Sequence, residues 1–115
     1  MKRENLVGFA EEKTKRAFLD LKKGKGAEPE LYDYLDRALD DLKFNPYSGI
    51  KIAERLWPKE YVKKYEITNL WKYDLPKSWR LIYTITAENE VEIVCALLEW
   101  FDHKNYERKF NIFNW

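Results

Sequence analysis

Arg80, His103 and Tyr106 have side chains of the types needed to bind an anion and to transfer protons. A guanidinium stays charged at physiological pH and can hold a phosphate with two donors. An imidazole titrates near neutrality, so it can act as a general acid or a general base. A tyrosine can stack on a base or join a proton transfer. Together these groups are suited to cleaving RNA.

The reaction that fits these groups is cleavage of RNA without a metal ion. The ribose 2′-hydroxyl attacks the adjacent phosphate, so the protein must remove one proton, supply another to the leaving oxygen and stabilise the added negative charge. Arg80 suits the last role, and His103 suits a proton transfer. The chain has one histidine and one cysteine, whereas zinc sites usually need three or four protein ligands. We therefore expect no metal and no other cofactor.

Each of the three residues also has an ordinary structural explanation. Arg80 could form an ion pair with Asp74 or with another carboxylate. His103, next to Asp102, could be an exposed or capping residue at the start of a helix. Tyr106 could be a half-buried packing residue. The residue types alone leave these alternatives open.

Basic residues are concentrated in the middle of the chain. The window from Lys51 to Arg80 contains eight basic and four acidic residues, a net charge of 8 − 4 = +4, whereas the whole chain carries +1. Aromatic residues are interleaved with these charges: Trp57, Tyr61, Tyr65, Trp71, Tyr73 and Trp79. This composition suits phosphate contact with base stacking, and Lys64, Lys72 and Lys77 are our candidate RNA-binding residues. The alternative is a solvated charged surface over an aromatic core.

Three strands are predicted to position these side chains. Leu70 to Leu75 and Ser78 to Thr86 are rich in aromatic and β-branched residues and are separated by a proline, which indicates a hairpin. Val91 to Trp100 follows a polar turn and is the third strand. Alternation puts Leu81, Tyr83 and Ile85 on one face and Arg80, Ile82 and Thr84 on the other. Arg80 should therefore point away from the main core.

Helices are predicted on both sides of these strands in the sequence. Asn5 to Lys23 shows a helical apolar stripe, although its opening residues Leu6 to Phe9 could instead form a strand. A second helix should begin near Pro29 and end at Asn45, and the short turn between the two favours an antiparallel helical hairpin. Asp102 can cap a final helix.

The final helix and the middle of the chain complete the predicted elements. In the final helix His103, Tyr106 and Glu107 should lie on one side, because they are three and four residues apart. Residues 48–53 should include a short extended segment, and residues 58–64 a turn of helix.

Composition predicts one globular domain spanning residues 1–115. The chain is 45% hydrophobic and 17% aromatic, which is enough for a single packed core. Cys95 lies inside an apolar run and should be a buried structural thiol. We see no signal peptide and no membrane span, so we expect a cytoplasmic protein without a membrane partner.

The run WRLIYTI at Trp79–Ile85, followed across one further strand by HKNYERKF at His103–Phe110, resembles the RelE/ParE superfamily of small toxins. In that family an arginine opening such a strand is catalytic or binds phosphate, and a C-terminal His or Tyr completes the site. By this resemblance those roles fall on Arg80, His103 and Tyr106. The similarity covers the C-terminal half well and the N-terminal helices only by layout.

The resemblance implies an α+β fold. An N-terminal helical hairpin would pack on a small twisted antiparallel sheet with a C-terminal helix, leaving a basic and aromatic cleft on the other face. It also implies the toxin of a type II toxin–antitoxin pair: an endoribonuclease, or mRNA interferase, that cleaves mRNA on the ribosome. A cognate antitoxin would inhibit it. Phe113 and Trp115 would be antitoxin contacts or part of a loosely packed tail.

Two other functions fit the same fold. A ParE-like inhibitor would bind a topoisomerase and would need neither Arg80 nor His103 as a catalyst. A non-catalytic RNA-binding relative would bind RNA in a salt-sensitive way without cutting it.

Overall fold

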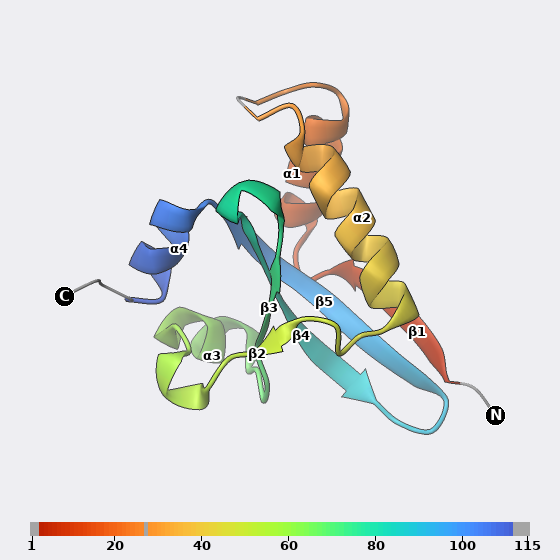
Figure 1. The fold of residues 1–115 in the computed structure, drawn as a ribbon. Helices are drawn as coiled ribbons and strands as arrows, with labels where there is room; N and C mark the ends of the chain where they lie inside the picture. Colours follow the sequence, from red (N-terminus) through yellow and green to blue (C-terminus); the bar gives the residue numbers. More distant parts are fainter. Residues whose placement is uncertain (1–2, 27, 112–115) are drawn as a thin grey trace.

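A five-stranded sheet organises the computed structural model, which describes residues 3–26 and 28–111. The strand order is β1-β5-β4-β3-β2 (Figure 1). The strands are β1 Glu4–Phe9, β2 Ile50–Lys51, β3 Trp71–Asp74, β4 Arg80–Glu88 and β5 Glu92–Phe101. Neighbouring strands are antiparallel except β1 and β5, which are parallel. The α+β class is confirmed, and the expected antiparallel sheet is corrected to a mixed one.

The parallel pair arises from the start of the chain. Residues 6–9, which our main prediction assigned to a helix and our alternative to a strand, form most of β1. They pair in register with β5, with Leu6 opposite Val94 and Phe9 opposite Leu97. Helix α1 is correspondingly shorter than predicted, Glu12–Lys22. Strand β5 supplies hydrogen-bond partners for the backbone of residues 6–9. These bonds favour the extended conformation of β1 over one more turn of helix α1.

Helix α2, Leu31–Phe44, has the apolar face that the sequence predicts. Its buried residues are Leu31, Leu35, Ala38 and Leu42, at helical spacing. The helix ends at Asn45, directly before a proline that cannot continue it. Side chains of α1 and α2 share one core cluster with Leu81, Tyr83 and Ile85 of β4, and the two helices lie together on one side of the sheet (Figure 1).

A second core lies under helices α3, Lys59–Tyr65, and α4, His103–Lys109. It contains Ile52, Tyr61, Ile67, Leu70, Ile82, Leu98, Tyr106 and Phe110. The predicted alternation of β4 is therefore confirmed, since Ile82 lies in this cluster and its neighbours lie in the first. Helices α3 and α4 cover the apolar centre of this face.

The remaining predicted features of local structure are also present. β2 falls within residues 48–53, α3 lies close to the predicted 58–64, and the β3–β4 hairpin turns through Pro76–Ser78. Cys95 is buried and free. Phe113 and Trp115 lie outside the described residues. In the described ranges, none of the helices combines the length and the apolar character needed to cross a bilayer.

Candidate functional site

Strand register brings several predicted residues to one end of the sheet. Asp74, at the end of β3, is opposite Arg80, at the start of β4, and Arg80 is in turn opposite Phe101, at the end of β5. Because α4 begins two residues after Phe101, the β3–β4 turn and the start of α4 lie at the same end (Figure 1). Segments far apart in the chain thus meet around Arg80.

The start of α4 is fixed by its cap. The Asp102 side chain accepts a hydrogen bond from the backbone N–H of Asn105, 2.8 Å away, as the sequence predicts. This geometry directs Tyr106 into the second core, where it packs on Phe110 with ring centroids 4.8 Å apart. His103 stays exposed on the same helix.

Arg80, Lys72, Asp74 and Tyr106 form one group, which we call the Arg80 cluster. The Arg80 Cζ atom lies 5.7 Å from the centroid of the Tyr106 ring, and the Lys72 Nζ atom lies 5.6 Å from it. Both distances are in the range of cation–π attraction. The Tyr106 ring therefore supports two cations at the sheet end, and the cluster contains two of the three predicted catalytic residues.

Asp74 joins the two cations. Its Oδ1 atom lies 3.0 Å from the Nε of Arg80 and 3.6 Å from the Nζ of Lys72, so the ion pair we gave as the structural alternative for Arg80 is present. The pair is poorly aligned, however. The Arg80 Nε is buried and, within the described part of the chain, is the only such side-chain nitrogen or oxygen without a hydrogen bond. With two cations and one carboxylate, the cluster has an excess of positive charge.

Tyr106 is protonated at neutral pH. Burial raises the pKa of its hydroxyl, and the charge of Arg80 offsets this only in part. A protonated phenol beside a cation can donate a hydrogen bond or a proton to an oxyanion. Tyr106 therefore packs in the core, as the structural alternative proposed, and also carries a group suited to proton transfer.

His103 makes a local contact. Its Nε2 lies 3.1 Å from Oε1 of Glu107, one helical turn later, and its side chain is 56% exposed. The predicted common side is thus confirmed for His103 and Glu107, whereas Tyr106, the third residue of that prediction, is buried in the second core. Among residues 3–26 and 28–111, no three His, Cys, Asp or Glu side chains lie close enough to hold a metal ion. His103 lies on the same helix as Tyr106 but is directed toward Glu107.

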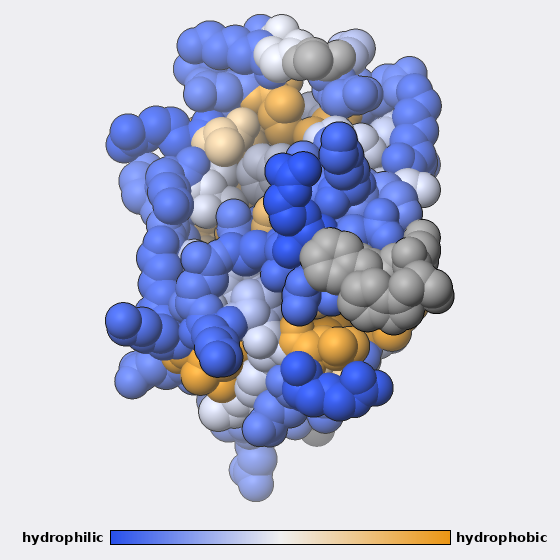
Figure 2. Space-filling view, turned by 90° about the vertical axis from the view of Figure 1, so that its left-hand side faces the viewer, coloured by the Kyte–Doolittle hydropathy of each residue, from blue (hydrophilic) through white to orange (hydrophobic). Residues whose placement is uncertain are grey.

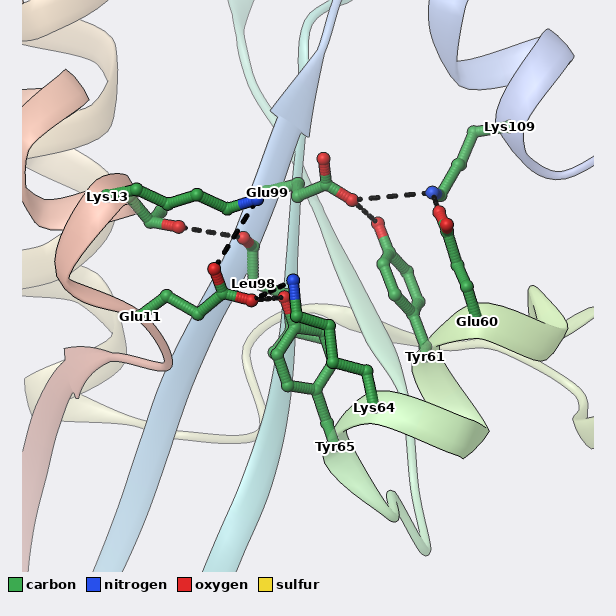
Figure 3. A network of polar contacts seen from close by, with 10 residues as sticks. Glu11, Lys13, Glu60, Tyr61, Lys64, Tyr65, Leu98, Glu99 and Lys109 are labelled. Atoms are coloured by element: carbon green, nitrogen blue, oxygen red, sulfur yellow. Dashed lines mark hydrogen bonds and ion pairs between the residues drawn. The ribbon is translucent and has the colours of Figure 1, made fainter.

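Lys64 belongs to a different network, drawn in Figure 3. It pairs with Glu11, which also accepts a 2.6 Å hydrogen bond from the Tyr65 hydroxyl and lies 3.5 Å from Lys13. The hydrogen bonds from Lys64 and Tyr65 lower the pKa of Glu11 to about 2. Lys64 therefore connects α3 to the turn before α1.

A second group of contacts beside this one reaches α4. The Tyr61 hydroxyl donates a 2.7 Å hydrogen bond to Glu99 of β5, and Lys109 of α4 pairs with both Glu99 and Glu60 (Figure 3). A cavity of about 360 Å³ lies among these residues, between α1, α3 and β5. Sequence analysis missed these contacts, because all of them except the one between Glu11 and Lys13 join side chains of different elements.

Lys77 is also engaged elsewhere. It pairs with Glu30, just before α2, which also accepts a hydrogen bond from Tyr34. Of the three predicted RNA-binding lysines, the structure thus brings only Lys72 to the Arg80 cluster. Lys64 and Lys77 each lie beside a carboxylate of another element.

An open hollow of about 630 Å³ lies at the same end of the sheet as the Arg80 cluster. We call it the aromatic hollow; it is lined by Trp79, Trp100, Phe101, Asp102, Asn105, Arg108 and Lys109. Trp79 directly precedes Arg80 in the chain, and Phe101 of β5 is the register partner of Arg80. Flat rings beside an exposed cation, here Arg108, are suited to stacking and holding unpaired bases.

Sequence analysis missed most of the aromatic hollow. In the sequence, Trp100 and Phe101 stand at the end of an apolar run. Their aromatic type and their position beside the start of the final helix were the only features that could have indicated the hollow. The surrounding side of the molecule, which carries α3 and α4, is mainly hydrophilic with separate hydrophobic patches (Figure 2).

Comparisons with family models, with curated proteins and with solved structures gave no match. The RelE/ParE resemblance therefore depends on this chain's own residues and remains a prediction. Physically, the Arg80 cluster can bind an anion, the aromatic hollow can stack a base, and Tyr106 and His103 can transfer protons.

Proposed function

We propose that this chain is a RelE/ParE-like toxin that cleaves mRNA as a metal-free endoribonuclease. The observation that supports this most strongly is the Arg80 cluster. An arginine opening β4 and a lysine from β3 both lie against the ring of a protonated tyrosine from α4, and both contact the carboxylate of Asp74. The aromatic hollow beside it supplies surfaces for the flanking bases.

In the proposed reaction the scissile phosphate binds to Arg80 and Lys72. His103, turned away from Glu107, accepts the proton of the ribose 2′-hydroxyl as its oxygen attacks the phosphorus. The bond from phosphorus to the 5′-oxygen breaks, and Tyr106 gives its proton to that leaving oxygen. The products are a 2′,3′-cyclic phosphate and a 5′-hydroxyl. Arg80 stabilises the charge that builds up on the phosphate oxygens.

The proposal also covers the context of the site. We take α1 and α2 as the helical hairpin of a RelE/ParE-like fold, packed on the sheet opposite α3 and α4. The protein would act in the cytoplasm on ribosome-bound mRNA, and a cognate antitoxin would inhibit it.

The experiment is induction in cells followed by mapping of transcript ends. Wild type should arrest growth and create new ends within messages, and the Arg80→Ala/His103→Ala double variant should do neither. Arg16→Ala, which removes an exposed arginine of α1, is the control and should behave as wild type.

Two outcomes would contradict this function. Equal growth arrest by wild type and the double variant, with intact messages, would point to a topoisomerase-binding inhibitor. No arrest by either, with salt-sensitive RNA binding retained, would point to a non-catalytic RNA-binding protein.

A further inference from the structure

Asp74 occupies the position between the two cations of the Arg80 cluster. Its Oδ1 lies 3.0 Å from Arg80 Nε and 3.6 Å from Lys72 Nζ. A phosphate oxygen that contacts both cations would need a similar position. The carboxylate and the phosphate therefore compete for the same donors.

The other contacts of Arg80 leave little room for both anions. Its Nη1 donates a 3.2 Å hydrogen bond to the backbone carbonyl of Trp79, and its guanidinium lies over the Tyr106 ring. The Nε atom is buried and directed to the Asp74 side. The edge of the guanidinium that includes Nε faces Asp74, so a phosphate held there by two parallel donors would take the place of the carboxylate.

Asp74 is also easy to displace. Its side chain is 46% exposed, whereas that of Arg80 is 17% exposed, so the carboxylate can turn into water while the guanidinium stays in place. The Nε–Oδ1 contact is not aligned as a hydrogen bond, which weakens it. Because one of its two partners is nearly half exposed, this ion pair contributes little to stability.

We infer that Asp74 is a built-in competitor of the RNA phosphate: it covers Arg80 and Lys72 in the free protein, and RNA binds by displacing it. This inference rests on the proposed function and adds the regulation of its anion site. Asp74 sets how strongly the site discriminates RNA from single free anions, because a polynucleotide also binds in the aromatic hollow, which offsets the displacement.

The test is binding of a fluorescein-labelled oligoribonucleotide with 2′-O-methyl sugars, which cannot be cleaved by 2′-hydroxyl attack. Asp74→Asn removes the carboxylate charge and nearly keeps its shape. Asp20→Asn on α1 is the matched control, since its side chain is 45% exposed and also pairs with a lysine, Lys25.

Asp74→Asn should bind the oligonucleotide about fivefold more tightly than wild type, and Asp20→Asn should stay within about twofold. The plot of log affinity against log salt should steepen by roughly 0.7 for each additional phosphate that the protein neutralises. Asp74→Ser, a second neutral replacement, should act in the same direction. In an Arg80→Ala/Lys72→Ala background the tighter binding of Asp74→Asn should disappear.

Several results would overturn the inference. Affinity of Asp74→Asn equal to that of Asp20→Asn would mean that Asp74 does not compete, and weaker binding would mean that it positions the cations. Tighter binding that persists without Arg80 and Lys72 would indicate a general charge effect. If wild type still cuts messages in the transcript-end experiment, any of these binding results would overturn the role of Asp74 and leave the proposed function intact. Tighter binding by Asp74→Asn without cutting by wild type would support the competitor and contradict the nuclease.

Discussion

At the scale of single residues, the proposed chemistry depends on how Arg80 is held. Asp74, the Tyr106 ring and the carbonyl of Trp79 contact its guanidinium from different elements. These contacts limit the rotamers of a long side chain, so less entropy is lost when a phosphate binds. The structural alternative and the functional role of Arg80 are thus compatible, because an ion pair to an exposed carboxylate can be exchanged for one to a substrate.

Tyr106→Phe separates packing from proton transfer. The ring that packs on Phe110 remains, so the free energy of unfolding should change by no more than about 1 kcal/mol. Loss of the hydroxyl should reduce the cleavage rate roughly 10²- to 10⁴-fold. Cleavage kinetics and urea unfolding measure the two effects. Tyr32→Phe, at the first core, is the control, and wild-type cleavage by Tyr106→Phe would reduce Tyr106 to a packing residue.

At the scale of elements, α3 is attached to the rest of the molecule by charged pairs as well as by its apolar face. Glu11, in the turn before α1, accepts hydrogen bonds from Lys64 and Tyr65 of α3. These contacts connect the two sides of the sheet around the end of β1. Because they involve a carboxylate, the stability that they contribute should depend on pH.

The stability contributed by Glu11 should be lost in acid. Its pKa is lowered from 4.5 to about 2 in the folded protein, so the unfolded chain binds a proton first as the pH falls. The contribution is full above pH 4.5 and disappears as the pH approaches about 2. The difference in free energy of unfolding between wild type and Glu11→Gln should therefore shrink over this interval. Urea unfolding at a series of pH values measures it.

Lys64→Gln provides the matching test of cause. It removes the largest contribution to the lowered pKa of Glu11, so it should weaken the pH dependence over the same interval. An unchanged difference between wild type and Glu11→Gln from pH 4.5 to about 2 would mean that these contacts do not stabilise the folded state.

Gly49, directly before β2, lies against the backbone of Lys72 in β3 and the side chain of Tyr83 in β4. A Cβ atom at this position would lie 2.6 Å from the backbone oxygen of Lys72 and 2.6 Å from the hydroxyl of Tyr83. Gly49→Ala should therefore reduce the free energy of unfolding by about 1–3 kcal/mol. Gly8→Ala on β1 is the control, since its Cβ would meet nothing within 4 Å. Urea unfolding measures the free energy of unfolding of both variants. Equal values for Gly49→Ala and Gly8→Ala would contradict the close packing around Gly49.

At the scale of the whole molecule, local patterns predicted local structure well. The alternation of β4, the apolar face of α2 and the Asp102 cap each depend on residues a few positions apart, and all are present. The parallel pairing of β1 with β5 could not be derived in this way, because it joins residues more than 80 positions apart.

The same distinction applies to the candidate site. Arg80 and Tyr106 could be chosen from residue type and resemblance, and the contact between His103 and Glu107 follows from helical spacing. The sequence could not show which of the three candidate lysines lies at the Arg80 cluster. The pairing of Lys64 with Glu11 and of Lys77 with Glu30 depends on tertiary packing. The covering of the second face by α3 and α4 is likewise a tertiary effect.

The most direct test of the proposed chemistry is the structure of the RNA ends produced in a reconstituted translation reaction with a single mRNA. Wild type and Arg16→Ala should leave a 2′,3′-cyclic phosphate upstream of the cut and a 5′-hydroxyl downstream, because the nucleophile is the ribose 2′-hydroxyl. Arg80→Ala should reduce this cleavage roughly 10²- to 10³-fold. An intact message with wild type, or equal cutting by Arg80→Ala, would contradict a nuclease built on the Arg80 cluster.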